Sequence, residues 1–487
     1  MKAEGKMIGL RSNQATNQSV QFRRLSSQQC QQLYWSCLEI LENTGVRLFS
    51  QDALDLLQKA GIKPTDGNRV RIPHGMVEKA LTTAPKRVTL YDRHGKRVMP
   101  VEGYRTFYGP GSDCLSIIDH GTGERRTAVL QDVINAVTVA DALPHIDFLM
   151  CMFLPRDVAQ TAVDRYQMEA MLSHSTKPIM FVTNEFSGCV DAVEMAEAVV
   201  GSADALRQKP TISCYINVTT GLIHNEDALK KLLYLSEKGL PAAYIPSTQG
   251  GVTAPVTPAG ALAVSQAGAL VGVVLSQLKR EGTPIILPGW GGNMLDMRTT
   301  VQPYADPDKR ALAADFVHYL GLPMFGLAGC SESKLVDQQA GIEAALTLMN
   351  AALCGANIIH DLGYLESGLC GSIAQLAICN EILSWLNHYM VSPEISSETV
   401  PLDLIDEIGP DGNFLECDHT YNHFKERWYP TLFDRNNFEG WFADGGKSLA
   451  ERASEQVENI LKNHQPEPLP DAVKQQLRAI VQRVESG

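Results

Sequence analysis

The feature that most constrains this fold is a regular alternation of short apolar runs and helical stretches between residues 105 and 390. Most of the apolar runs are continuous, which is typical of parallel strands that are buried on both faces. We expect strands at 105–109, 146–153, 178–184, 211–217, 242–248, 284–289, 324–328 and 356–360, and helices near 129–142, 157–173, 189–200, 225–238, 258–280, 307–320, 338–354 and 372–390. Eight strand–helix units in series predict an α/β fold of the (β/α)8 or TIM barrel type.

An open, doubly wound sheet has the same alternation of strands and helices, so periodicity does not separate it from a barrel. The missing phosphate-binding fingerprints do discriminate. No GxGxxG follows the first predicted strand, and no GxxxxGK[ST] occurs anywhere in the chain. The sequence therefore favours the barrel over the open sheet.

Two segments of different composition flank the predicted barrel. The first contains three helical patterns and a hairpin signal, in which Asp92-Arg93-His94-Gly95 joins two short extended runs. The last is rich in aromatic residues and ends in two amphipathic helices, which we expect to pack on the barrel. The predicted domains are an N-terminal α+β cap over 1–104, the (β/α)8 barrel over 105–392, and a helical, aromatic-rich C-terminal extension over 393–487.

The composition narrows the classes of partner. A formal net charge of −13 argues against nucleic acid and against an anionic membrane surface. The eleven cysteines form no CxxC pair, and several lie in apolar runs, as free thiols do in reducing compartments. The start of the chain lacks a signal-peptide core, and we find no apolar segment long enough to span a bilayer. We expect a cytoplasmic protein. The sequence does not decide whether the chain forms a homo-oligomer.

The stretch 323–368 concentrates polar groups just after two predicted strands. Its helix carries an apolar face, which we expect to be buried, and Asp337 is placed to cap the start of that helix. Polar groups at the carboxyl ends of parallel strands are typical of a barrel active site. The predicted apolar face is Ile342, Ala345, Leu346, Met349 and Leu353, and the polar groups that follow the second strand are His360, Asp361, Tyr364 and Glu366.

Several segments resemble the trimethylamine methyltransferase superfamily, including LENTGVRLFSQDALDLLQKAG, TFYGPGSDCLSIID, GCSESKLVDQQAGIEAALTLMNAALCGANIIHDLGYLESGL and DHTYNHFKERWYPTLFDR. The resemblance implies a (β/α)8 barrel that passes a methyl group from a methylamine to the cobalt of a separate corrinoid (cobalamin) protein. Every residue is standard, so the chain resembles the branch without pyrrolysine, which demethylates quaternary amines such as glycine betaine, proline betaine or carnitine. The best-supported substrate is glycine betaine, giving dimethylglycine.

The chemistry of a quaternary amine suggests the residue types to look for. The nitrogen already carries its charge and leaves as a neutral amine, so no general acid is required. A quaternary ammonium has no N–H and is usually held by aromatic faces. The candidate substrate-binding residues at predicted strand ends are Trp290, Tyr108, Phe153, Tyr364, Asn184 and Gln249, and the candidate catalytic residues are His360 and Glu332.

Each candidate also has a structural interpretation. Trp290 could plug the barrel top, and His360 could be held in place by Asp361. No HxH, HExxH or CxC motif occurs, so we expect no metal bound by this chain. Two other classes of function stay open: a metal-assisted TIM-barrel hydrolase using His360, Asp361 and Glu332, and a betaine-binding protein without catalysis.

Overall fold

The computed structural model describes residues 21–290, 292–307 and 310–486, and its centre is a curled parallel sheet. The first strand pairs with the last, which is what a closed barrel requires, and the order is β5-β16-β15-β13-β11-β9-β8. The strands are β5 (Phe107–Pro110), β8 (Ile179–Phe181), β9 (Ile212–Val218), β11 (Ala242–Pro246), β13 (Ile285–Pro288), β15 (Met324–Leu327) and β16 (Ile358–Leu362). The prediction of a (β/α)8 barrel is confirmed.

The eighth position of the ring is filled by the segment that contains Asp147 and Leu149, which is extended but lacks regular strand pairing. The Asp147 amide donates to the Tyr108 carbonyl at 2.6 Å, and the Met180 amide donates to the Leu149 carbonyl at 2.8 Å. This segment therefore lies between β5 and β8 and closes the ring. The prediction of a regular strand over 146–153 is wrong. An Asp147 carboxylate oxygen accepts from the Tyr108 amide at 2.9 Å and so interrupts the backbone hydrogen bonds between the two segments.

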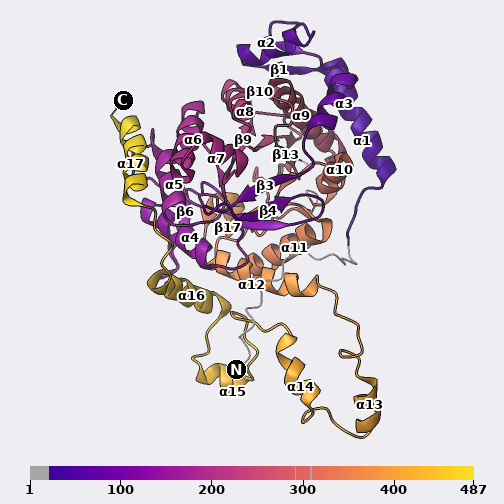
Figure 1. The fold of residues 1–487 in the computed structure, drawn as a ribbon, viewed down its shortest axis with the longest axis vertical. Helices are drawn as coiled ribbons and strands as arrows, with labels where there is room; N and C mark the ends of the chain where they lie inside the picture. Colours follow the sequence, from indigo (N-terminus) through magenta and orange to yellow (C-terminus); the bar gives the residue numbers. More distant parts are fainter. Residues whose placement is uncertain (1–20, 291, 308–309, 487) are drawn as a thin grey trace.

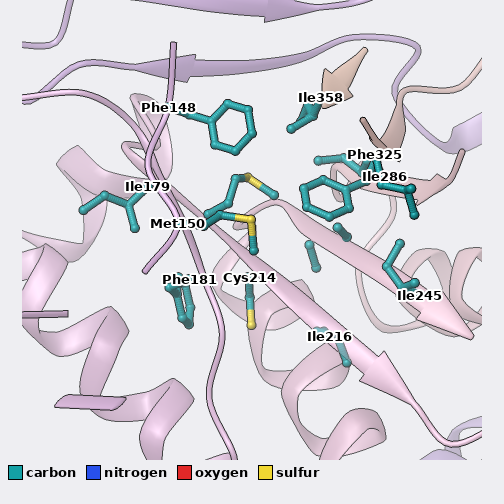
Figure 2. Packing of buried hydrophobic residues seen from close by; sticks show 14 of the residues in the cluster. Phe148, Met150, Ile179, Phe181, Cys214, Ile216, Ile245, Ile286, Phe325 and Ile358 are labelled. Carbon is teal, nitrogen blue, oxygen red and sulfur yellow. The ribbon is translucent and has the colours of Figure 1, made fainter. Parts of the chain in front are cut away.

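Helices surround the ring of strands (Figure 1). The alternation follows the prediction, although two helices start later than expected, at Val163 and Leu312. Apolar side chains such as Phe148, Met150, Phe181 and Phe325 fill the interior (Figure 2). The helices are α4 (Leu130–Ala142), α5 (Val163–Ser173), α6 (Phe186–Val200), α7 (Ala203–Gln208), α8 (Glu226–Lys238), α9 (Pro258–Lys279), α10 (Leu312–Leu320), α11 (Gln338–Cys354) and α12 (Ile373–Tyr389).

The N-terminal segment covers the outer face of α9. Helices α1, α2 and α3 all contact α9, so α9 is buried on every side, and this explains why it is apolar all round. By length and composition α9 is apolar enough to cross a membrane, contrary to our expectation, but it is a core helix here. The elements are α1 (Ser27–Glu39), a π-helical turn (Ile40–Thr44), β1 (Val46–Leu48), α2 (Gln51–Lys59), β2 (Arg69–Val70), α3 (His74–Thr83), the hairpin β3 (Val88–Tyr91) and β4 (Arg97–Val101), and β10 (Ile223–His224), which pairs with β1.

Helix α11 buries a different face from the predicted one. Small residues such as Ala340, Ala344 and Ala351 face the interior, whereas Ile342 is 59% and Leu346 64% exposed. The prediction of a buried Ile342–Leu346 face is wrong, since both stripes of α11 are apolar and the small one allows closer packing. Asp337 does cap the helix, accepting from the Ala340 amide at 3.0 Å.

The C-terminal segment divides into a packed part and an extended part. Helix α16 (Leu449–Asn463) contacts α12 and α4, and α17 (Asp471–Glu485) contacts α5 and α6, as expected. Residues 393–427, which we call the arm, leave the end of α12 and extend away from the barrel (Figure 1). No residue of the arm is buried, so the expected packing is wrong for this stretch. The elements of the arm are α13 (Leu402–Ile408), α14 (Asp418–His423) and the 3-10 turn Phe424–Glu426, and α15 (Phe438–Ala443) follows the arm.

Short strands in the loops after the barrel strands build a roof over the carboxyl end of the ring. Two small sheets form there, one with order β17-β18-β6-β7 and one pairing β12 with β14. They hold the long loops that follow β5, β11, β13 and β16. Their bounds are β6 (Ser116–Ile118), β7 (Arg125–Thr127), β12 (Gln249–Gly250), β14 (Asn293–Met294), β17 (Tyr364–Leu365), the 3-10 turn Glu366–Gly368 and β18 (Cys370–Gly371).

Candidate active site

A cavity of about 440 Å³ lies at the carboxyl end of the barrel strands. Active sites of this fold are found at that end, because the loops after the strands converge there. Buried residues such as Leu327 form its floor, and exposed residues such as Asn217 and Thr253 form its mouth. The lining residues are Ser112, Asp113, Tyr215, Asn217, Thr219, Ser247, Thr248, Gln249, Thr253, Trp290, Gln302, Tyr304, Leu327, His360, Asp361 and Tyr364.

Four aromatic side chains wall the cavity: Trp290, Tyr215, Tyr304 and Tyr364. The ring centroids of Trp290 and Tyr215 each lie 5.9 Å from that of His360, and those of Tyr304 and Tyr364 are 6.1 Å apart. Burial raises the pKa of the Tyr215 and Tyr364 hydroxyls, helped by nearby carboxyl groups, so both phenols stay neutral. Neutral electron-rich faces around one space are suited to a cation without N–H groups.

Two carboxyl groups, Asp113 and Asp361, share this cavity with the aromatic rings. Burial raises the pKa of Asp113 to about 6, although the Gln167 side chain donates to it at 2.8 Å. Both aspartates have positive φ, 63° for Asp113 and 80° for Asp361. Such strained backbone in residues other than glycine clusters at functional sites, where the surrounding structure holds it in place.

His360 stands on the floor of the cavity at the end of β16. Its Nδ1 lies 2.6 Å from the Gly326 carbonyl oxygen, so Nδ1 carries the hydrogen of that contact. Its Nε2 lies 3.2 Å from an oxygen of Asp361. The ring also packs against Phe325, with centroids 4.2 Å apart. These contacts on both nitrogens fix the plane of the imidazole, so His360 presents one orientation to the cavity.

Apart from Leu327, the rest of the lining is polar and uncharged. Tyr215, Asn217 and Thr219 alternate along β9 and its end, which puts all three on the same face of the strand. Among the residues that the structure describes, no lysine or arginine lines the cavity. Thr248 is 2% exposed, and its hydroxyl has no hydrogen-bond partner within the described part of the chain. The cavity therefore combines net negative charge with neutral hydrogen-bonding groups.

The structure brings four of the eight predicted site residues into this cavity and places four outside it. Trp290, Gln249, Tyr364 and His360 line it. Trp290 is 6% exposed, so it serves both interpretations: it packs against Phe325 and also walls the cavity.

Tyr108, Phe153 and Asn184 lie elsewhere. Tyr108 and Phe153 are buried in the core of the barrel. Tyr108 of β5 pairs with Ile359 of β16, and the Phe153 carbonyl accepts from the Gln167 side chain. Asn184 is exposed on the loop before α6. We therefore do not carry these three residues into the proposed site.

Glu332 contacts a loop of the site and does not line the cavity. Its two carboxylate oxygens accept from the backbone amides of Tyr304 at 2.6 Å and Ala305 at 3.0 Å. Glu332 is held in turn by Glu343, which accepts from its amide at 2.8 Å. Its geometry suits a residue that positions Tyr304, in place of the ammonium contact that we expected from the sequence.

Sequence reasoning missed several residues of the cavity, among them Asp113, Tyr215 and Tyr304. Asp113 follows the first barrel strand, so the rule that sites gather after strands could have found it. Tyr215 lies two residues before Asn217, and strand periodicity places both on one face. Tyr304 lies in the long loop between β13 and α10, and no local pattern in the sequence distinguishes it.

Within the described ranges, no group of three or more His, Cys, Asp or Glu residues is arranged to hold a metal ion. His360 has Asp361 beside it, but its other nitrogen is occupied by a backbone carbonyl. Glu332 is turned to the Tyr304 loop. The three residues of the hydrolase alternative thus do not converge on one point.

Comparison with known proteins identifies the family. The sequence profile of the family described as trimethylamine methyltransferase (MTTB) matches residues 2–487. This chain belongs to the trimethylamine methyltransferase family. The resemblance stated from its motifs is therefore confirmed.

Relatives within the trimethylamine methyltransferase family differ in the substrate they are named for. Trimethylamine methyltransferase of Desulfitobacterium hafniense (strain DSM 10664 / DCB-2) is 31% identical over 464 residues, which cover 94% of this chain and 93% of that protein. Glycine betaine methyltransferase of Desulfitobacterium hafniense (strain Y51) is 29% identical over 463 residues, covering 94% and 96%. Family membership thus establishes a methyltransferase and leaves the amine open.

A solved structure supports the fold of this family member. The monomethylamine methyltransferase of Methanosarcina barkeri superposes with a TM-score of 0.50 at 11% identity, covering 91% of this chain and 90% of that one. At this identity the likeness concerns the fold alone.

Proposed function

We propose that this chain transfers a methyl group from a small quaternary amine, glycine betaine first, to Co(I) of a separate corrinoid protein. The observation that carries the proposal is the cavity itself, with four aromatic walls, two carboxyl groups and no lysine or arginine among the described lining residues. Such a lining attracts a permanent cation, and a quaternary ammonium has no N–H that the carboxyl groups could deprotonate. Dimethylglycine is the product when glycine betaine is the donor.

The residues of the cavity bind and orient the donor. Each aromatic face contributes ~0.5–2 kcal/mol of attraction to a quaternary ammonium, most where water is excluded. The carboxylates of Asp113 and Asp361 add the opposite charge. When a methyl group is taken, the C–N electron pair stays on nitrogen, so the leaving amine is neutral and no proton is supplied. The corrinoid supplies the Co(I) nucleophile, and this chain supplies alignment and exclusion of water.

The carboxylate of a betaine needs hydrogen-bond donors away from the two aspartates. The Thr248 hydroxyl is buried at the cavity wall and has no partner among the described residues. Leaving such a group unpaired costs about 1–3 kcal/mol, and a ligand oxygen would remove that cost. Gln249 and Thr253 lie beside it on the same loop. This loop is our proposed carboxylate subsite, and it favours a betaine over a donor without a carboxylate.

The shape of the site agrees with delivery of the corrinoid by another protein. Asn217, Thr219 and Thr253 are exposed where the cavity meets solvent, while His360 and Asp361 are buried at its floor. A flat cofactor presented by a partner can cover such a mouth without entering the barrel. The donor would then lie between the floor and the cofactor.

The test is methylation of free cob(I)alamin by the purified chain, followed by its absorption spectrum. Glycine betaine, proline betaine, carnitine, choline and trimethylamine would be offered in parallel. We expect turnover with glycine betaine to exceed that with the other four. Faster turnover with proline betaine or carnitine would move the substrate and keep the reaction, whereas faster turnover with trimethylamine would contradict the quaternary amine assignment.

The same experiment addresses the other two classes. A betaine-binding protein without catalysis would show ligand affinity by calorimetry and no methylation of cob(I)alamin. A metal-assisted hydrolase would contain stoichiometric metal and lose its activity to a chelator. We expect methylation activity that survives chelator treatment.

A further inference from the structure

The arm, residues 393–427, has a large exposed apolar surface. Its helices have six or seven residues, too few to be stable in isolation, and none of its residues is buried. Leu402 is 70% and Leu415 80% exposed, and Tyr421 is 77% exposed. Defined helices without a core of their own indicate a partner surface. The exposed large apolar residues of the arm are Ile395, Val400, Leu402, Ile405, Phe414, Leu415, Tyr421 and Phe424.

The outer face of α11 is a second unpartnered apolar surface. Ile342 and Leu346 are one helical turn apart and both point away from the barrel, with exposed Leu335 nearby in sequence. Helix α11 lies next to α12, from whose end the arm departs (Figure 1). The two apolar surfaces thus belong to the same flank of the molecule.

The arm is strongly acidic, and this restricts what it can pack against. Two arms side by side would repel each other, so pairing of arm with arm is unfavourable. Helix α11 contains one acidic residue, Glu343, so its apolar outer face has no comparable negative charge. The charged residues of the arm are Glu394, Glu398, Asp403, Asp406, Glu407, Asp411, Glu416, Asp418 and Glu426 against Lys425 and Arg427.

A permanent partner fits the arm better than a transient one. A corrinoid protein would have to reach the cavity mouth, where other apolar residues, Val252, Val256 and Met297, are exposed on the roof loops. It would also leave after each turnover and uncover the arm. A second copy of the chain is always present, and two arms with two α11 faces offer apolar surface on the order of the ~1,600 Å² that a stable interface buries.

We propose that two copies of this chain form a two-fold dimer in which each arm lies on the α11 face of the other copy. The interface is reciprocal, so each dimer contains two identical arm–face contacts. This proposal does not depend on the substrate or on methyl transfer.

The test uses the full chain and two variants in sedimentation velocity over a range of micromolar concentrations. The face variant is Leu346→Glu, and the arm variant is Leu402→Glu/Leu415→Glu. All three side chains are exposed in one copy, so the subunit fold should be unchanged by circular dichroism. We expect the wild type to sediment as a dimer and each variant to dimerise on the order of 100-fold more weakly, because a charge is desolvated at the contact. Phe49→Glu, an apolar site on the N-terminal segment whose side chain is 51% exposed, should leave the dimer intact.

Mixing the two variants gives the sharper result. A mixed dimer retains one undamaged contact, between the arm of the face variant and the face of the arm variant. Each single-variant dimer has a damaged surface in both contacts, and one damaged surface is enough to break a contact, so we expect the mixture to dimerise more tightly than either variant alone. A monomeric wild type would overturn the proposal, and so would a mixture no tighter than its components.

Discussion

At the scale of single residues, the site depends on side chains from six different barrel loops or strands meeting around one cavity. Trp290 contributes a large face on one wall and is almost fully enclosed. Asp113 supplies a carboxyl group whose pKa is raised by burial. Thr248 offers an unused hydroxyl among the described residues. Each gives a prediction that separates binding from folding.

Trp290→Ala should weaken glycine betaine binding by ~1–2 kcal/mol, since one cation–π face and its packing are lost. Isothermal titration calorimetry would measure the change, alongside a thermal melt. Trp290→Phe keeps an aromatic face and should recover part of the loss. Unchanged affinity in a well-folded alanine variant would remove Trp290 from the cation site.

Thr248→Val keeps the shape of the side chain and removes its hydroxyl. We expect the dissociation constant for glycine betaine to rise about 10- to 150-fold, which corresponds to the loss of one hydrogen bond to a charged group, worth about 1.5–3 kcal/mol. Tetramethylammonium has no carboxylate, so its affinity should stay unchanged. An equal loss for both ligands would contradict the carboxylate subsite.

Asp113 predicts a pH dependence of cation binding. Burial raises the pKa of its carboxyl to about 6, so the group is neutral below that pH and charged above it. Donor affinity should therefore increase as pH rises from 5 to 7. The same shift disfavours the folded state as pH rises from about 4 through 6, because the unfolded chain ionises more easily. Asp113→Asn should flatten the affinity profile, and a profile identical to the wild type would exclude this role.

At the scale of elements, the roof loops depend on contacts made far from their own sequence. The loop between β13 and α10 carries Tyr304, and Glu332 from the β15–α11 loop holds its backbone through two amides. The β12 and β14 strands join the loops after β11 and β13. The rigidity of the cavity wall therefore depends on these hydrogen bonds and on this strand pairing.

Glu332→Ala should loosen the Tyr304 loop without removing any residue from the cavity lining. We expect KM for the donor to rise about 10-fold with a smaller effect on kcat, because a wall of the cation site becomes mobile. Glu332→Gln keeps one amide contact and should be intermediate. A variant that lost kcat alone, with KM unchanged, would instead assign Glu332 to the chemical step.

At the scale of the whole molecule, one buried carboxylate holds the C-terminal segment at the point where it returns from the arm to the barrel. Glu381 of α12 accepts from the amides of Thr431, Leu432 and Phe433 at 2.8 to 3.2 Å, and from the Thr431 hydroxyl at 2.6 Å. Beyond this point, α16 and α17 close over α4, α5, α6 and α12. The arm lies between α12 and this attachment, so both of its ends are fixed.

Glu381→Ala should lower the free energy of unfolding by about 2–4 kcal/mol, because four donors, one of them buried and the others partly buried, lose their acceptor at once. Chemical denaturation would measure the change. Glu398→Ala, on the exposed arm, is the matched control and should alter stability by less than about 0.5 kcal/mol. Equal effects of the two substitutions would show that the attachment is not made by Glu381.

Hydrophobic periodicity predicted the alternation of strands and helices, because burial on both faces of a parallel strand makes successive residues apolar. The missing phosphate-binding fingerprints then favoured the barrel over an open sheet, and the rule that active sites follow the strands indicated the end at which the site lies. It also located Trp290, Gln249, His360 and Tyr364, which stand where strands end. Three features arose instead from contacts between distant segments: the buried face of α11, the meeting of Asp113 with Tyr304, and the exposed arm. Local spacing shows that a stripe is apolar, but whether that stripe meets the sheet, a loop or another molecule depends on which segments pack beside it.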